Sequence, residues 1–347
     1  MPAPELQSTV TALLGPRKGL LAADESFKTI GKRFEALGIA STEESRRAYR
    51  GLLVTAPALA EHISGVILYD ETIRQALGGT LMPCVLSKRG IIPGIKVDKG
   101  TVALPCFAAE KFTQGLDGLG DRLAEYWRLG ARFTKWRAVI GIGEGLPTRA
   151  CIEANAHALA LFAAMSQEAG LVPIVEPEVL MDGDHTLACC EEVTGVVLRA
   201  VFSELFSHRV VLETMLLKTG MVLSGKESSA QADTGEVAEA TIRCLRRAVP
   251  ASVPGVVFLS GGQEGIAATQ RLNAICGAGG APWKLSFSFG RALQDAALTA
   301  WRGSAASVEA AQAALLHRAR CNGLAVQGRY SEAAERANPE PELSAAR

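Results

Sequence analysis

The sequence predicts an α/β fold, a single (β/α)8 barrel with a helical extension at its N-terminus and a flexible tail at its C-terminus. Three observations predict it: short apolar runs recur along the chain, helical segments separate them, and polar residues stand at their carboxyl ends. Most of the runs begin about 30 to 45 residues apart, a spacing typical of repeated strand–helix units. They occupy residues 18–24, 65–71, 94–100, 131–137, 171–178, 210–218, 255–262 and 284–293.

The runs have the composition of buried parallel strands. Segments such as GVILYDE (65–71) and GVVFLSGG (255–262) are short and rich in Val, Ile, Leu and Phe. Because both faces of a barrel strand are covered, a continuous apolar run is expected instead of alternation. An open doubly wound sheet is the alternative architecture. It needs a reversal of strand order that nothing in the sequence indicates, and no G-x-G-x-x-G motif follows the first run.

The segments between the runs predict helices. Residues 121–130 carry apolar side chains at helical spacing and stop at a glycine. Residues 148–170 form a longer helix, with Thr148 as the N-cap and Gly170 as the stop. Residues 235–248 are amphipathic and predict another helix.

Composition bounds the domain count and excludes several functions. A chain of 347 residues, 48% of them hydrophobic, is sufficient for one large core, so residues 1–330 are predicted to form one barrel domain. Residues 331–347 are polar and rich in Ala and Pro, and we expect a poorly ordered tail there. The 36 basic and 36 acidic residues balance, which argues against nucleic-acid binding, and no apolar stretch approaches the length of a membrane span.

Cysteine and histidine usage indicates a reduced protein without a catalytic metal. The eight cysteines include no C-x-x-C, and the start of the chain lacks a charged leader followed by an apolar block, so we expect a cytoplasmic protein. The five histidines are scattered, with no H-x-H or H-E-x-x-H motif, and neither a metal nor a cofactor is predicted.

Polar residues gather at the carboxyl ends of the runs, the face where barrel enzymes place their sites. Strand residues two apart share a face, so pairs such as Glu176 and Glu178 can point together into the barrel mouth. Taken singly, Asp24 is equally well explained as a helix cap, and Lys96 with Asp98 as an exposed ion pair. The repetition over several strands favours one shared cavity. These residues are Asp24, Lys96, Asp98, Lys135, Arg137, Glu176, Glu178, Lys218, Ser260 and Ser288.

Lys218, which ends the apolar run 210–218, indicates carbonyl chemistry. Burial lowers the pKa of a lysine, and a neutral amine attacks a ketone to form a Schiff base. The alternative is a solvated lysine at a strand end, the commoner case for a lone residue.

Two anion sites are also predicted. The turn Ser260–Gly261–Gly262 follows the seventh run, and Gly290 and Arg291 stand where the eighth turns into a helix. Loops after the last two strands of such barrels often bind phosphate. A second pocket would use Ser26, Thr29, Lys32 and Arg33 in the segment 24–33, unless these residues only cap a helix and form its solvated basic face.

At this point the chain resembles class I fructose-bisphosphate aldolases over about residues 8–330. The resemblance is carried by segments in family order: LLAADES, STEESRRAYRGLL, GIKVDKG, TQGLDGL, FTKWRAVI, VPIVEPEVLMDGDH, LLKTGMV, FLSGGQ, LNAI, FSFGRALQ and QGRY. It implies metal-independent, reversible cleavage of fructose 1,6-bisphosphate into dihydroxyacetone phosphate and glyceraldehyde 3-phosphate. It also implies a homotetramer on a TIM barrel. The alternatives are the same chemistry on another phosphoketose, such as sedoheptulose 1,7-bisphosphate, and a non-catalytic sugar-phosphate-binding scaffold.

The resemblance implies a role for each candidate residue. Lys218 looks like the Schiff-base lysine, Glu176 like the general acid/base, and Glu178 like its supporting neighbour. Lys135 looks like the cation that polarises the intermediate, and Asp24 like the residue that handles the hydroxyl proton during cleavage. The implied substrate contacts are Lys96 and Arg137 for the sugar chain, Ser260, Gly261, Gly262, Ser288, Gly290 and Arg291 for the main phosphate, and Arg33, Ser26 and Thr29 for the second.

Overall fold

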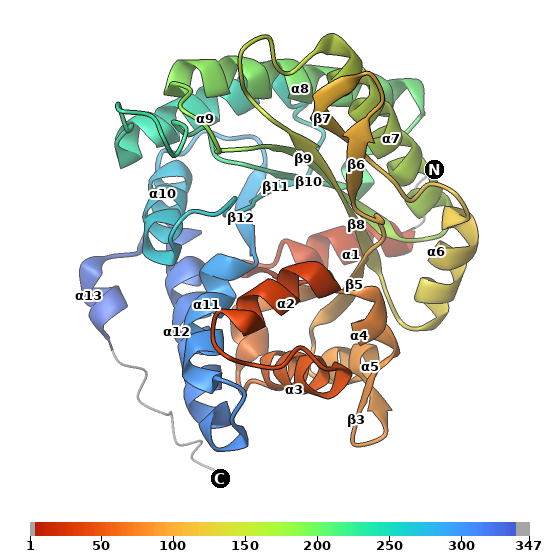
Figure 1. Cartoon of the computed structure of the whole chain (residues 1–347), viewed down its shortest axis with the longest axis vertical. Coiled ribbons are helices and arrows are strands. Elements are labelled where there is room, and N and C mark those ends of the chain that lie inside the picture. Colours follow the sequence, from red (N-terminus) through yellow and green to blue (C-terminus); the bar gives the residue numbers. More distant parts are fainter. Residues whose placement is uncertain (1–3, 338–347) are drawn as a thin grey trace.

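In the computed structural model, which describes residues 4–337, eight parallel strands close into a barrel surrounded by helices (Figure 1). The predicted fold class is therefore confirmed. Around the barrel the strands follow the order β1-β12-β11-β10-β9-β8-β5-β2. Their bounds are β1 (Gly19–Ala23), β2 (Ile63–Leu68), β5 (Ile92–Lys96), β8 (Phe133–Ile140), β9 (Val172–Val179), β10 (Leu216–Thr219), β11 (Gly255–Phe258) and β12 (Lys284–Phe289).

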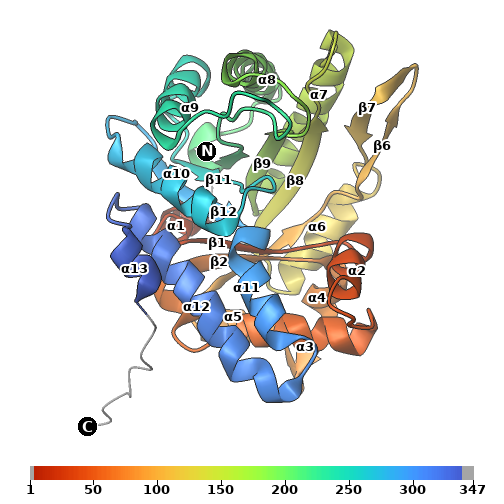
Figure 2. The ribbon, with the colours of Figure 1, turned by 60° about the vertical axis from the view of Figure 1, so that its left-hand side comes forward.

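Helices form the outer layer of the fold, and two β-hairpins lie outside the barrel. The hairpins are β3 (Ala76–Leu77) with β4 (Thr80–Leu81), and β6 (Thr101–Leu104) with β7 (Phe107–Thr113); the second projects beyond the barrel (Figure 2). The α-helices are α1 (Pro4–Leu13), α2 (Phe27–Glu35), α3 (Glu43–Val54), α4 (Asp70–Arg74), α5 (Met82–Lys88), α6 (Leu119–Arg128), α7 (Arg149–Glu168), α8 (Leu187–Ser207), α9 (Thr234–Ala248), α10 (Gly265–Gly277), α11 (Arg291–Trp301), α12 (Val308–Ala325) and α13 (Glu332–Arg336). Short 3-10 turns lie at Leu59–Glu61, Leu212–Thr214 and Ala305–Ser307.

The expected helix signals operate as predicted. The hydroxyl of Thr148 accepts a hydrogen bond from the backbone N–H of Cys151 at the start of α7. Helix α9 begins at Thr234 with a capping box, in which Asp233 and Glu236 each accept a hydrogen bond from the backbone N–H of the other.

The core has two layers, and α1 closes one end of the barrel. Side chains inside the barrel, including Phe133 and Leu216, form one apolar cluster with Leu13 and Leu14 from the α1 region. A larger cluster fills the space between strands and helices. The inner layer is tight: a Cβ added to Gly94 would lie 2.2 Å from the Phe133 ring, so only glycine fits there. With the amino end sealed, the carboxyl ends of the strands are left to form a site.

Several predicted runs are longer than the strands they contain; for example, the run 94–100 ends its strand at Lys96 and the run 255–262 at Phe258. The run 210–218 is a strand only from Leu216, because the segment before it forms a 3-10 turn. The Gln167 side chain of α7 donates hydrogen bonds to the Val211 carbonyl and to the Thr214 hydroxyl, so these polar groups of the turn have partners. The run 65–71 ends its strand at Leu68, since α4 begins two residues later.

The predicted tail is structured in its first part. Helix α13 begins after Ser331, whose hydroxyl caps it. Glu335 of this helix forms an ion pair with Arg318 of α12 and accepts a hydrogen bond from the Tyr330 hydroxyl at 2.6 Å. The remainder of the predicted tail, 338–347, lies outside the described residues. None of the helices in the described part of the chain combines the length and apolarity needed to cross a membrane.

Candidate active site

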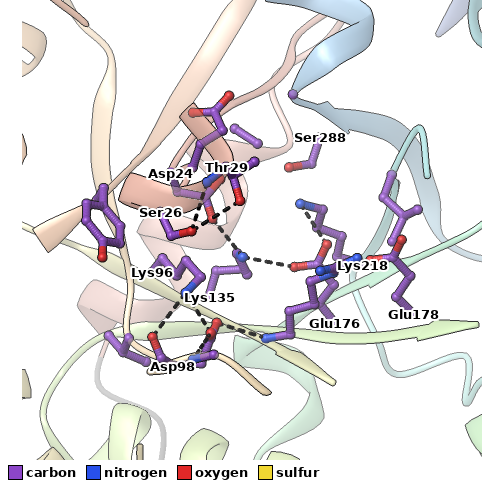
Figure 3. Close-up of a pocket in the computed structure, with 18 of the residues that line it drawn as sticks. Asp24, Ser26, Thr29, Lys96, Asp98, Lys135, Glu176, Glu178, Lys218 and Ser288 are labelled. Carbon is purple, nitrogen blue, oxygen red and sulfur yellow. Dashed lines mark hydrogen bonds and ion pairs between the residues drawn. The ribbon is translucent and has the colours of Figure 1, made fainter. Parts of the chain in front are cut away.

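A cavity of about 780 Å³ opens at the carboxyl ends of the barrel strands (Figure 3). All the predicted site residues except Lys32 and Gly262 line it. The barrel strands carry Lys96, Lys135, Arg137, Glu176, Glu178, Lys218 and Ser288, and the loops and helices that follow the strands carry the others. The lining includes Asp24, Ser26, Thr29, Arg33, Lys96, Asp98, Lys135, Arg137, Glu176, Glu178, Lys218, Ser260, Gly261, Ser288, Gly290 and Arg291.

Lys218 lies in the floor of this cavity. Its side chain is 5% exposed, and its Nζ lies 2.9 Å from Oε1 of Glu176. The two residues come from neighbouring strands, β10 and β9, whose register pairs Leu217 with Val175. One residue further along, Lys218 and Glu176 therefore stand side by side. An ammonium proton on the lysine can pass directly to that carboxylate, because the atoms are already within hydrogen-bonding distance.

Lys135 of β8 lies between two carboxylates. Its Nζ is 2.7 Å from Oδ2 of Asp24 and 3.3 Å from Oε2 of Glu176. Burial alone would lower the pKa of Lys135, but attraction to Asp24 and Glu176 raises it well above its ordinary value. For Asp24, burial would raise the pKa, and the charges of Lys135 and then Lys218 hold it well below 3.8. Lys135 is thus protonated and Asp24 ionised at neutral pH.

The other charged residues of the cavity form two ion pairs at its rim. Glu178 forms an ion pair with Arg137, and Lys96 lies 2.6 Å from Oδ1 of Asp98. Burial would lower the pKa of Arg137, but Glu178 raises it, so this guanidinium stays charged. Asp98 also accepts hydrogen bonds from the backbone N–H groups of Gly100 and Arg137. These contacts fix both rim cations in place over the cavity.

The main predicted anion site combines a glycine turn, a helix start and a buried hydroxyl. Gly261 and Gly262 have φ values of 60° and 97°, so the turn after β11 needs glycine and exposes its backbone N–H groups. Helix α11 begins at Arg291, which puts a helix N-terminus at the cavity. The buried hydroxyl of Ser288 lacks a hydrogen-bond partner among the described residues and is free for a ligand.

In the second predicted anion region, neighbouring carboxylates already pair with the cation. Ser26 caps α2 and its hydroxyl lies 3.1 Å from that of Thr29. Arg33 reaches the cavity, but its guanidinium is paired with Glu25 at 2.6 Å and with Asp295 at 2.9 Å. An anion bound there has to share this cation with two carboxylates.

A further cation, which the sequence did not predict, lies beside the glycine turn. Lys226, in the loop after β10, is paired with Asp182 at 2.9 Å. A Cβ added to Gly262 would lie 2.9 Å from Nη2 of Arg291 and 3.2 Å from Nζ of Lys226, so both cations sit against the same glycine turn. The strand-end pattern does not reach this residue, because it lies in a loop outside any strand.

The fold and site define a (β/α)8-barrel enzyme with a buried lysine–carboxylate centre and anion-binding turns at its rim. A family model described as fructose-bisphosphate aldolase class I matches residues 5–346. The chain is 53% identical over 328 residues to the probable fructose-bisphosphate aldolase class 1 of Xanthomonas campestris pv. campestris, covering 94% of this chain and 98% of that one.

Two further comparisons agree. The Arabidopsis thaliana protein named fructose-bisphosphate aldolase 4, cytosolic, is 49% identical, with 94% of this chain and 84% of that one covered. A structure of Plasmodium falciparum fructose-bisphosphate aldolase, solved in complex with TRAP and an inhibitor, superposes with a TM-score of 0.93 at 48% identity, covering 94% of this chain and 95% of that one. The chain belongs to the class I fructose-bisphosphate aldolase family, and it reversibly cleaves fructose 1,6-bisphosphate into dihydroxyacetone phosphate and glyceraldehyde 3-phosphate.

Proposed function

We propose that this cleavage proceeds through a Schiff base on Lys218, with Glu176 as the group that moves the protons. The observation that carries the proposal is the 2.9 Å contact between Lys218 Nζ and Glu176 Oε1 in a buried setting. Lys135 is a permanent cation beside the same carboxylate. The neutral amine attacks the C2 ketone and forms a carbinolamine. Glu176 then donates the proton with which the hydroxyl leaves as water, and a protonated imine remains.

Carbon–carbon cleavage follows from the charge layout. As the C3–C4 bond breaks, its electron pair moves into the imine and gives an enamine, while the C4 hydroxyl loses its proton and becomes the aldehyde. Asp24 is ionised at neutral pH and accepts that hydroxyl proton, with Lys135 beside it balancing the charge. Glu178, held by Arg137, supports the proton traffic at Glu176. Protonation of the enamine at C3 and hydrolysis of the imine release dihydroxyacetone phosphate and the free lysine.

The substrate phosphates are proposed to occupy opposite sides of the cavity. Ser260, Gly261, Gly262 and Ser288 with the start of α11 would hold one, supplemented by Lys226 next to Arg291. The other would lie at Ser26, Thr29 and Arg33, with Lys96 and Arg137 along the sugar chain. Binding at both ends holds the reacting bond against the buried lysine, which lowers the entropic cost of reaction.

We infer a cytoplasmic homotetramer that serves glycolysis and gluconeogenesis. The Arabidopsis relative is named cytosolic. The homotetramer is inferred from membership of the family. Analytical ultracentrifugation tests the stoichiometry.

Borohydride trapping tests the Schiff base. Incubating the protein with dihydroxyacetone phosphate and reducing with borohydride is expected to add one covalent adduct, which peptide mapping places on Lys218. Lys218→Ala should fold, form no adduct there and lose turnover. Lys88→Ala removes an exposed lysine of α5 and should behave like the wild type. An adduct that maps elsewhere, or cleavage by Lys218→Ala at the wild-type rate, contradicts the proposal.

A further inference from the structure

Two histidines and a glutamate meet on the outer surface, where helices α7 and α8 lie side by side (Figure 1). His157 comes from α7, Glu204 from the last turn of α8, and His208 is the C-cap of α8. Nδ1 of His157 is 3.0 Å and Nδ1 of His208 is 3.6 Å from Oε2 of Glu204. None of these residues lines the catalytic cavity.

The cluster has the size of a metal site. One ligand atom from each residue lies within 4.8 Å of the other two. Ligands of a tetrahedral zinc ion, at about 2.0–2.2 Å from the metal, are roughly 3.3 Å apart, so small side-chain rotations close the site. The two imidazole rings are already in edge-to-face contact, with centroids 4.9 Å apart. Both rings therefore reach the same carboxylate before any ion is bound.

The surroundings of the cluster favour a cation. Nδ1 of His208 also lies 2.9 Å from the backbone oxygen of Glu204, which holds the ring beside the carboxylate of that residue. The end of α8 carries the negative pole of the helix dipole. Among the described residues, the ion pairs of Glu204 are with these two histidines alone, and no lysine or arginine neutralises it.

We infer that His157, Glu204 and His208 form a binding site for a divalent transition-metal ion of the zinc type. Imidazole nitrogen with one carboxylate suits zinc, nickel or copper, whereas magnesium and calcium prefer oxygen ligands alone. The side chains of His157, Glu204 and His208 are 55%, 34% and 21% exposed, so an ion can enter and water can complete its coordination. The ion ties α7 to α8 and takes no part in the cleavage.

The ligands were not recognisable from sequence spacing. Glu204 and His208 are one helical turn apart, but His157 belongs to the preceding helix, and only the packing of α7 on α8 unites them. This arrangement joins two elements of the outer layer, so binding should stabilise the folded chain.

Zinc titration of the metal-stripped protein tests the site. Calorimetry on the full-length wild type and on His157→Ala/His208→Ala should show that the double variant loses one equivalent of bound zinc per chain. Glu204→Gln should weaken that equivalent by about tenfold or more. His62→Ala, which removes a histidine outside the cluster, should retain it. Zinc should raise the Tm of the wild type and of His62→Ala more than that of the double variant.

Zinc bound elsewhere, for example at surface thiols, binds equally to the wild type and to the double variant. It therefore does not affect the difference in stoichiometry between them. Fructose 1,6-bisphosphate cleavage should be unchanged in the double variant, which separates this site from the catalytic one. Equal stoichiometry and affinity in the wild type and the double variant overturns the inference. So does a wild type that binds no zinc saturably.

Discussion

Lys218 and Glu176 face each other across neighbouring strands, with the lysine Nζ 2.9 Å from the carboxylate Oε1. The register of β9 against β10 sets this contact, because Leu217 pairs with Val175 and the next residues continue the ladder. Glu176 makes a second ion pair, at 3.3 Å, with Lys135 of β8. The Glu176 carboxylate therefore contacts two lysines with different proposed tasks. Lys218 exchanges a proton with it, whereas Lys135 stays protonated.

Glu176→Gln should lower kcat by about 10²- to 10⁴-fold, the usual contribution of a positioned acid/base. The amide retains the shape of the side chain but cannot exchange a proton with Lys218. If Glu176 acts in the transition state, kcat and kcat/KM should fall together. Steady-state kinetics measures both, and borohydride trapping should slow in parallel.

The control for this variant is Glu178→Gln. Glu178 lies two residues away on the same strand, and its ion-pair partner is Arg137. We expect a smaller loss than in Glu176→Gln. A larger loss would reverse the roles assigned to the two glutamates.

Lys135→Met should destabilise the fold as well as stop catalysis. The substitution leaves Asp24 and Glu176 buried without the cation between them, and breaking a buried pair in this way costs about 3–5 kcal/mol. Urea denaturation with and without Asp24→Asn gives the coupling between the two residues. The double variant should be more stable than the sum of the single losses predicts. Additive losses would mean that the two groups do not interact.

Acid should selectively remove the stabilising contribution of Asp24. Its pKa is lowered in the folded protein from 3.8, because Lys135 and Lys218 outweigh the effect of burial. A depressed folded pKa stabilises at every pH above the unfolded value and loses its effect as pH falls toward the folded value. The difference in free energy of unfolding between the wild type and Asp24→Asn should therefore be constant from neutral pH down to about 5 and shrink below about 4. Denaturation at several pH values measures it, and a difference that grows on acidification would give the pKa shift the opposite sign.

Strand-end side chains could be predicted because alternation and barrel closure determine where they point. Lys96, Lys135, Glu176 and Lys218 reach one cavity for that reason. The pairing of Arg33 with Asp295 could not be predicted, since the two residues lie at opposite ends of the sequence and meet only when the barrel closes.

The boundaries that differ from prediction have equally local causes. The apolar run 210–218 contains a 3-10 turn because a side chain of α7, Gln167, binds its backbone. Apolar composition alone does not distinguish that turn from a strand. Likewise, Lys226 lies in a polar loop whose path is set by backbone hydrogen bonds to the loop after β9, for example from the Lys226 N–H to the Met181 carbonyl.

The last prediction concerns that loop lysine. Lys226→Ala should raise KM for fructose 1,6-bisphosphate while leaving kcat nearly unchanged, because a charge that touches only the phosphate binds substrate and transition state alike. Lys226→Arg should restore much of the affinity, since it returns the charge beside Arg291. The effect of Lys226→Ala should also diminish at high salt, because the half-exposed ammonium is screened. Asp182→Asn provides the complementary measurement: it frees Lys226 from its present ion pair and should lower KM. If Lys226→Ala and Asp182→Asn both leave KM unchanged, the ammonium only anchors the loop, and the phosphate is held by the glycine turn and Arg291 without it.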